Sequence, residues 1–143
     1  MQAMTVAHAM STALITVEMD FTLDVIEQIM IKRHIGHVLV VDQGKLVGII
    51  SDSDVKKQIS PRSHSDLATT AEQRLLFIKA HQFMTRQPIV ISPDSPILEA
   101  LNLLLSHHIH ALPVVDHGHL VGIITDGDLL RAFRFQLENE GKA

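Results

Sequence analysis

The sequence VVDQGKLVGIISDSD at residues 40–54 occurs again, with few changes, as VVDHGHLVGIITDGD at residues 114–128. In each copy, two runs of aliphatic residues flank a short polar segment that contains a glycine, Gly44 in the first copy and Gly118 in the second. Such a pattern predicts a β-hairpin whose turn places the glycine at positive φ. A helix is expected to begin directly after each hairpin, near Asp52 in the first copy and at the equivalent residue in the second.

The similarity extends upstream of the hairpins, so that residues 10–57 align with residues 84–131 without a gap. A short apolar stretch and then an amphipathic helix are predicted before each hairpin, with Thr22 and Ser95 as N-caps and Pro96 at the first helical position. The order β-α-β-β-α, found twice, predicts an α/β fold of two repeats that pack as one pseudo-symmetric module. The helix residues expected to face the core recur at i, i+3 and i+7: Leu23, Ile26 and Met30, then Ile97, Ala100 and Leu104.

The predicted organisation has four parts. The first repeat covers residues 6–58. A connector, made of a loop and a helix, covers residues 59–83. The second repeat covers residues 84–138, and a short tail covers residues 139–143. The connector helix is expected over about residues 70–80, packed on the pair of repeats.

Composition excludes several classes of function. The 12 Lys and Arg residues are outnumbered by 16 Asp and Glu, and the chain has no Trp or Tyr, so no nucleic-acid surface is expected. The absence of cysteine excludes disulfides and thiolate metal sites. No basic residue precedes Lys32 and no apolar run approaches the roughly 18 residues of a membrane span, so we expect a cytoplasmic protein with no membrane partner.

The segments at residues 48–54 and 122–128 resemble the signature of CBS domains: a glycine, two aliphatic residues, Ser or Thr, two variable residues and Asp. Residues 112–116 resemble the second strand of that family. The resemblance covers both repeats, and the whole arrangement is most similar to stand-alone CBS-pair proteins of the acetoin-utilisation type.

The resemblance implies clefts between the repeats that bind AMP, ATP, related adenosine compounds or S-adenosylmethionine. Asp54 and Asp128 are then the ribose candidates, because a carboxylate can accept hydrogen bonds from both ribose hydroxyls. Ser51 and Thr125 stand where strand becomes helix, so their hydroxyls and the following N–H groups are expected to meet a phosphate. Family correspondence adds residues near the base, in the opening strands and at the start of the second strand: Ile49, Ile123, Leu14, Pro88, Gly36, His37, His110 and Ala111.

Each functional interpretation has a simpler alternative. Asp54 and Asp128 could cap their helices without any ligand, and one cleft or both could bind. The histidines around His107, His108 and His110 lack ligand spacing, so no metal site is expected. The sequence contains neither a Gly-x-Ser-x-Gly nucleophile turn nor a Gly-x-x-x-x-Gly-Lys phosphate loop, so no enzymatic activity is expected. The chain is therefore interpreted as a homodimeric regulatory module that takes an adenosine nucleotide as ligand, needs no obligatory cofactor and reports to an unknown effector protein. The alternative is a ligand-free structural dimerisation module.

Overall fold

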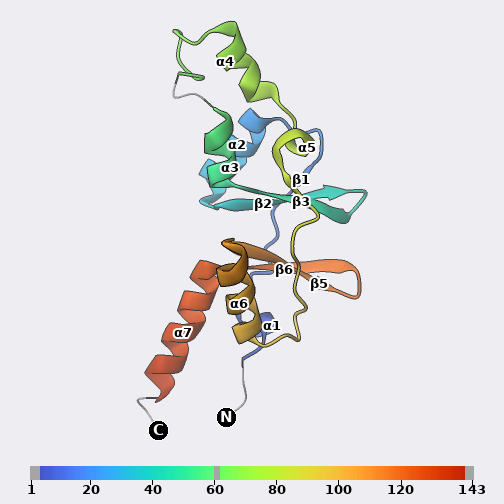
Figure 1. The fold of residues 1–143 in the computed structure, drawn as a ribbon, viewed down its shortest axis with the longest axis vertical. Helices are drawn as coiled ribbons and strands as arrows, with labels where there is room; N and C mark the ends of the chain where they lie inside the picture. The colour runs from blue at the N-terminus through green and yellow to red at the C-terminus, as the bar shows by residue number, and fades with distance from the viewer. Residues whose placement is uncertain (1–3, 60–61, 141–143) are drawn as a thin grey trace. The chain divides into compact units, whose positions relative to one another are not determined.

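The computed structural model describes residues 4–59 and 62–140, which divide into two compact units (Figure 1). The first-repeat unit is Ile15–Pro88. The second-repeat unit combines the segment that ends at Leu14 with the chain from Ile89 onward. None of the described helices is long and apolar enough to cross a membrane.

The first-repeat unit is a four-stranded sheet with helices. Its strand order is β1-β2-β3-β4, in which β1 runs parallel to β2 and the other pairs are antiparallel. In chain order its elements are β1 (Thr16–Glu18), α2 (Leu23–Arg33), β2 (His37–Asp42), β3 (Lys45–Ser51), α3 (Asp52–Gln58), α4 (Thr70–Arg74), the 3-10 helix η1 (Leu75–Phe77), α5 (Ala80–Phe83) and β4 (Thr85–Arg86).

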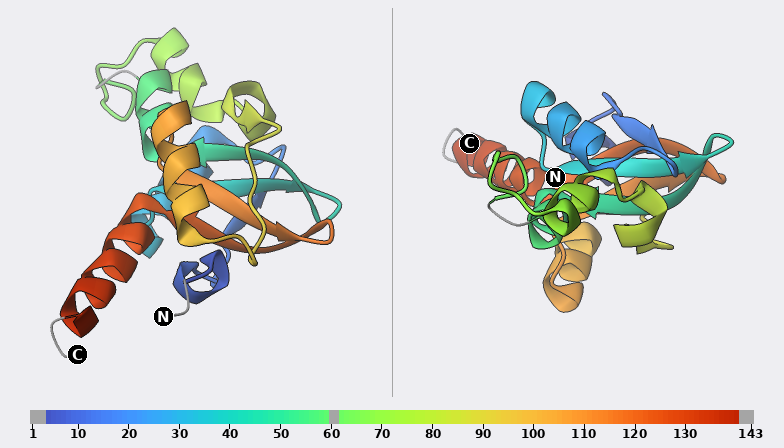
Figure 2. Two further views of the ribbon diagram at one scale, coloured as in Figure 1. Left: turned by 60° about the horizontal axis from the view of Figure 1, so that its bottom comes forward. Right: turned by 90° about the horizontal axis from the view of Figure 1, so that it is seen from above.

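The second-repeat unit repeats this plan with shorter pairings. Single bridges, Ile91 to Val114 and Ser11 to Ile123, stand where the first repeat has its outer strands. The elements are α1 (Val6–Ala9), α6 (Ile97–His107), β5 (Ala111–Asp116), β6 (His119–Thr125) and α7 (Asp126–Glu140). The C-terminal half of α7 projects beyond the β5–β6 hairpin (Figures 1 and 2). The α/β class and the duplicated element order predicted from sequence are confirmed.

The two hairpins share the same turn conformation and the same strand register. Gly44 and Gly118 have φ of 77° and 82°, as predicted, and the residues before them, Gln43 and His117, are also at positive φ. Two consecutive residues at positive φ give the turn whose twist matches that of the flanking strands. Each hairpin also carries the same register shift between the two residues of its Val-Val pair.

The predicted helix faces are confirmed, and one cap is not. Leu23, Ile26 and Met30 are buried in the first core, as are Ala100 and Leu104 in the second, where Ile97 is partly buried. The prediction that Ser95 caps α6 is wrong, because Pro96 is the N-cap and the helix begins one residue later. The carbonyl oxygen of Ser95 instead accepts a hydrogen bond from Val6 N at 2.8 Å.

Each core contains a segment that precedes the other repeat in the chain. In the second-repeat unit, Val6 of α1 is fully buried, and Ser11 exchanges two backbone hydrogen bonds with Ile123. In the first-repeat unit, Ala80 of α5 is fully buried and β4 pairs with β3. The two leading segments are therefore exchanged between the cores, an arrangement that the linear repeat did not predict.

A glycine in each hairpin admits the exchanged segment. A Cβ placed on Gly48 would lie 2.4 Å from Met84 Sδ and 3.0 Å from the carbonyl oxygen of Thr85. A Cβ on Gly122 would lie 2.7 Å from Met10 Sδ and 2.9 Å from the carbonyl oxygen of Ser11. Because a backbone oxygen stands behind each methionine, a side chain cannot be accommodated by rotating the methionine alone.

The connector differs from its prediction. The expected single helix over residues 70–80 is broken into α4, η1 and α5. The break has a physical cause: Leu23 N donates to the carbonyl oxygen of Ile78 at 2.8 Å, and Lys79 bridges Thr22. The chain has to be extended there to pair with the start of α2. The connector is therefore part of the first core, to which Leu76 and Ile78 contribute.

Substituting either close-contact glycine with alanine is expected to destabilise the fold. We predict that Gly48→Ala and Gly122→Ala each lower the free energy of unfolding by about 1–3 kcal/mol, the usual cost of overpacking. Gly36→Ala is the control, because its Cβ would meet only the Asp52 carboxyl group at 3.9 Å. Urea denaturation measures all three variants. If Gly48→Ala and Gly122→Ala were as stable as Gly36→Ala, the exchanged segments would not pack against the two glycines as closely as in the structure.

Candidate functional site

The candidate site residues gather at the junction where the second hairpin strand becomes a helix. Ser51 ends β3 and stands opposite His37 at the start of β2, and Thr125 ends β6 opposite Ala111. The first helical amides complete the junctions: Asp52 N donates to the Gly36 carbonyl oxygen at 2.8 Å, and Asp126 N to the His110 carbonyl oxygen at 3.0 Å. Within each unit the structure thus brings together the hydroxyl residue and the pair that precedes or begins the neighbouring strand.

Strand alternation places the proposed base contact beside the hydroxyl. Ile123 and Thr125 are two residues apart on β6, so they project from the same face, and both are partly exposed. The buried residues between and before them, Ile124 and Gly122, face the core. Ile49 and Ser51 repeat this arrangement on β3.

The first-repeat junction is a reciprocal helix cap. Asp54 N donates to Ser51 Oγ at 3.1 Å, and Ser51 N donates to Asp54 Oδ2 at 2.8 Å. The capping alternative for Asp54 is therefore physically present. The second carboxylate oxygen, Asp54 Oδ1, accepts no hydrogen bond from the described residues and can still accept one from a ligand.

The second-repeat junction has the same cap with a more fully engaged carboxylate. Thr125 N and Thr125 Oγ1 both donate to Asp128 Oδ2, at 2.9 and 3.1 Å, and Asp128 N donates to Thr125 Oγ1 at 3.3 Å. Arg131 Nη2 donates to the other oxygen, Asp128 Oδ1, at 2.6 Å. The two junctions are alike in backbone geometry and differ in what holds the carboxylate.

The amides expected to receive a phosphate are already used at the second junction. Asp126 N donates to His110, Gly127 N donates to Asp126 Oδ1 at 2.8 Å, and Asp128 N donates to Thr125. In the first turn of α7, the backbone N–H groups of these three residues therefore each have an acceptor within the junction. A phosphate at this junction would have to displace one of these acceptors or use a side-chain donor.

The remaining candidate residues lie near the unit boundaries or on the surface. Leu14 is the last residue of the exchanged segment in the second-repeat unit, and Pro88 is the last residue of the first-repeat unit. His110 is exposed, and its Nδ1 lies 3.0 Å from Asp126 Oδ2. Within residues 4–59 and 62–140, no three His, Asp or Glu side chains are grouped so as to hold a metal ion.

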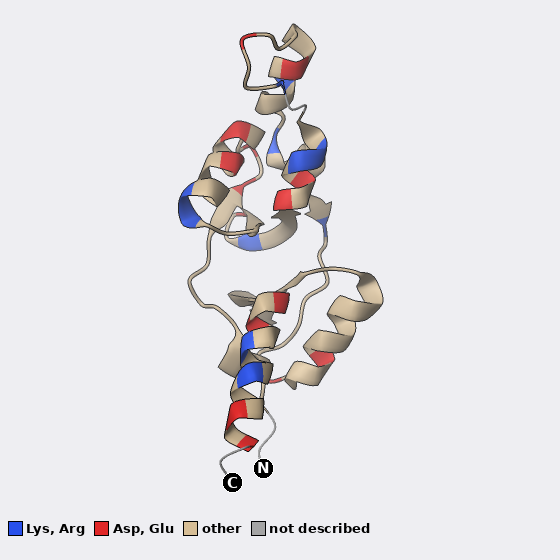
Figure 3. Cartoon of the chain, turned by 90° about the vertical axis from the view of Figure 1, so that its left-hand side faces the viewer, with Lys and Arg blue, Asp and Glu red and all other residues tan. Residues whose placement is uncertain are grey.

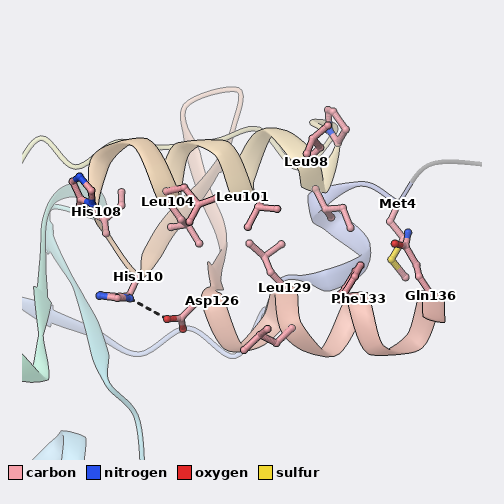
Figure 4. A pocket seen from close by; sticks show the side chains of 15 residues that line it. Met4, Leu98, Leu101, Leu104, His108, His110, Asp126, Leu129, Phe133 and Gln136 are labelled. Carbon is pink, nitrogen blue, oxygen red and sulfur yellow. Dashed lines mark hydrogen bonds and ion pairs between the residues drawn. The ribbon is translucent and has the colours of Figure 1, made fainter. Parts of the chain in front are cut away.

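The structure also contains an apolar groove that sequence reasoning missed. It lies between α6 and α7, has a volume of about 890 Å³ and reaches the His110–Asp126 pair at one end (Figure 4). Its signal was present in the sequence, because α6 has apolar residues on its outer face as well as on its inner one, and the helix is almost free of charge (Figure 3). The partly exposed apolar side chains that line it include Leu98, Leu101, Leu105, Leu130 and Phe133.

The same face of the first repeat is mixed in character, because Leu105 and Phe133 align with the apolar residues Ile31 and Ile59, whereas the other counterparts are charged. The residues aligned with Leu98, Leu101 and Leu130 are Asp24, Glu27 and Lys56. Glu27 Oε1 is held by His64 Nε2 of the connector at 2.8 Å. The outer face of α6 in the second repeat is therefore apolar, whereas the corresponding face of α2 in the first repeat contacts the connector through Glu27 and His64.

Two β-α-β-β-α repeats, each with a hydroxyl–carboxylate junction at the start of its last helix, define a duplicated α/β module. The chain belongs to the CBS domain family, whose model matches residues 6–61 and 80–134, and it is a tandem CBS pair.

Solved structures similar to the chain are also CBS pairs. The CBS domain pair of MJ0100, in complex with 5′-methylthioadenosine and S-adenosyl-L-methionine, has a TM-score of 0.78 and 29% identity over 94% of this chain and 99% of its own. A protein named AcuB, for acetoin utilization, from Vibrio cholerae has a TM-score of 0.79 and 26% identity over 99% and 98%. CBSX2 in complex with AMP has a TM-score of 0.76 and 26% identity over 94% and 98%.

Proposed function

We propose that this chain is a regulatory module that binds an adenosine-containing ligand at its strand–helix junctions and signals through a change in conformation or in a dimer contact. The observation that carries the proposal is the repeated junction itself, in which a hydroxyl and a carboxylate three residues apart close a helix start. Two structurally similar CBS pairs hold adenosine compounds. Ligand-driven signalling then follows as a shift between pre-existing states.

The chemistry of the junction suits a nucleoside. Asp54 and Asp128 are the proposed ribose acceptors, with Ile49 and Ile123 on the adenine and Ser51 and Thr125 beside the sugar or phosphate. In the family's arrangement Gly36, His37, His110, Ala111, Leu14 and Pro88 complete the two clefts. No step of this proposal requires catalysis, a metal or an obligatory cofactor.

The proposed output is a homodimer contact read by an effector protein. The groove between α6 and α7 exposes a continuous apolar surface, which in soluble proteins marks an interaction site. A second copy of the same helices is the proposed occupant, because the corresponding face of the first repeat is interrupted by Asp24, Glu27 and Lys56 and so offers a less complementary surface. The resulting contact is two-fold symmetric, with α6 and α7 of each copy on both sides.

An adenosine ligand is expected to stabilise the fold. A ligand that binds only the native state adds roughly 2.7 kcal/mol at about 100 times its dissociation constant, which corresponds to a rise of several degrees in melting temperature. A thermal-shift series with AMP, ATP, S-adenosylmethionine and GTP measures this, and AMP or ATP should act at lower concentrations than GTP. If none of the adenosine compounds moves the midpoint at millimolar concentration, the ligand-free structural module is the better description.

The two carboxylates are expected to contribute unequally. Asp128→Asn keeps the side-chain shape but removes charge from bonds worth about 1.5–3 kcal/mol, so affinity should fall by roughly tenfold or more. Asp54→Asn should lower affinity less, because the first junction has Gly36 where the second has His110. Calorimetry on both variants decides the matter. Equal losses would contradict the asymmetry, and no loss in either would remove ribose recognition.

The dimer is expected to depend on the α6–α7 groove. Leu101→Glu, which introduces the residue type that the first repeat has at this position, should convert a micromolar dimer into a monomer by placing a charge in the contact. Leu67→Glu on the connector is the matched control, because Leu67 is 75% exposed and lies outside the groove. Sedimentation velocity distinguishes the species. A monomeric wild-type chain, or dissociation by both substitutions, would contradict the proposed contact.

A further inference from the structure

The Asp128 carboxylate is already paired with a cation. Arg131 lies one turn further along α7 and donates from Nη2 to Asp128 Oδ1 at 2.6 Å, while Thr125 occupies Oδ2. The side chain of Asp128 is 11% exposed and that of Arg131 is 64% exposed. A ribose that approaches Asp128 therefore meets a carboxylate whose outer oxygen is held by a solvent-facing guanidinium group.

The guanidinium group of Arg131 lies beside Gly127. A Cβ on Gly127 would be 3.5 Å from Arg131 Nη1 and 3.7 Å from Nη2, which are ordinary contact distances. The first repeat has Ser53 and Lys57 at the two aligned positions. Within the described residues, Lys57 makes no ion pair with Asp54, so the two junctions differ in this contact.

We propose that Arg131 selects the ligand of the second-repeat site: it leaves Asp128 when the ribose binds and pairs with the ligand's phosphate, so that the site takes adenosine phosphates in preference to adenosine compounds without a phosphate. The inference rests on the function proposed above. It assigns to the site a ligand class that the shared fold does not, because similar CBS pairs hold both AMP and the phosphate-free 5′-methylthioadenosine.

The exchange needs little free energy. The arginine end of the ion pair faces solvent, which screens the attraction, and the flexible arginine stem allows its head group to move while Asp128 stays in the cap. The planar guanidinium group then binds a phosphate through two parallel hydrogen bonds, which are stronger than neutral ones.

The backbone at this junction leaves the phosphate to side-chain donors, of which Arg131 is the permanently charged one. The N–H groups of Asp126, Gly127 and Asp128 are all satisfied within the junction, and Thr125 Oγ1 donates its single hydrogen to Asp128. A phosphate beside α7 therefore finds no open donor in the first helical turn. Without Arg131, it would face the acidic side chains of Asp126 and Asp128, with His110 beside them but already 3.0 Å from Asp126 Oδ2.

The test compares AMP with adenosine and 5′-methylthioadenosine by calorimetry on the full chain and on Arg131→Gln. We expect Arg131→Gln to weaken AMP binding about tenfold while adenosine and 5′-methylthioadenosine bind unchanged or slightly more tightly, since their competitor for Asp128 is gone. The ratio of AMP affinity to adenosine affinity should therefore fall about tenfold. Arg131→Lys, which keeps the charge but loses the planar fork, should give an intermediate ratio.

Arg134→Gln is the matched control, because it removes the same charge from an exposed position one turn further along α7. Repeating the series on Asp54→Asn, which weakens the first-repeat site, shows whether the change in affinity ratio belongs to the second-repeat site. An unchanged affinity ratio in Arg131→Gln, or an equal fall in Arg134→Gln, overturns the role of Arg131 and leaves the proposed function standing. If none of the three compounds binds the wild-type chain, the proposed function fails, and the inference fails with it.

Discussion

The close approach of an exchanged chain segment to a hairpin glycine is the contact on which both repeats depend. Met10 packs against Gly122 and Met84 packs against Gly48, each so closely that a β-carbon on the glycine would have no space. Each core is completed by residues that precede the other repeat, so neither repeat can bury its apolar face from its own sequence alone. The two repeats therefore depend on each other's leading segments, and one repeat alone would lack part of its core.

The same strand connects that contact to the candidate site. On β6 the buried residues Gly122 and Ile124 alternate with Ile123 and Thr125, which face outward. Ser11 of the exchanged segment pairs with Ile123, two residues before the cap that holds Asp128. The proposed ligand would contact the cap at the end of β6, and the other face of β6 is packed in the core. A change at the cap would therefore reach the core of the unit through this one strand.

The sequence predicted the elements whose signal is local and missed those set by contacts across the chain. The hairpin turns, the buried faces of α2 and α6 and the starts of α2, α3 and α7 follow from residue spacing within one repeat. The exchange of leading segments, the broken connector helix and the N-cap at Pro96 depend on backbone pairing with distant residues such as Val6 and Leu23. At the junctions, spacing indicated Asp54 and Asp128, but the pairing of Asp128 with Arg131 and the occupied amides required coordinates.

The most direct test of the central claim is a titration of the ¹⁵N-labelled chain with AMP, followed by the backbone amide resonances. If adenosine compounds bind at the strand–helix junctions, the largest shifts should come from Ile123, Thr125 and Asp128 and from their counterparts Ile49, Ser51 and Asp54. The outer face of α6, represented by Leu98 and Leu101, should shift far less. Shifts confined to the α6–α7 groove, or none at millimolar AMP, would contradict the account.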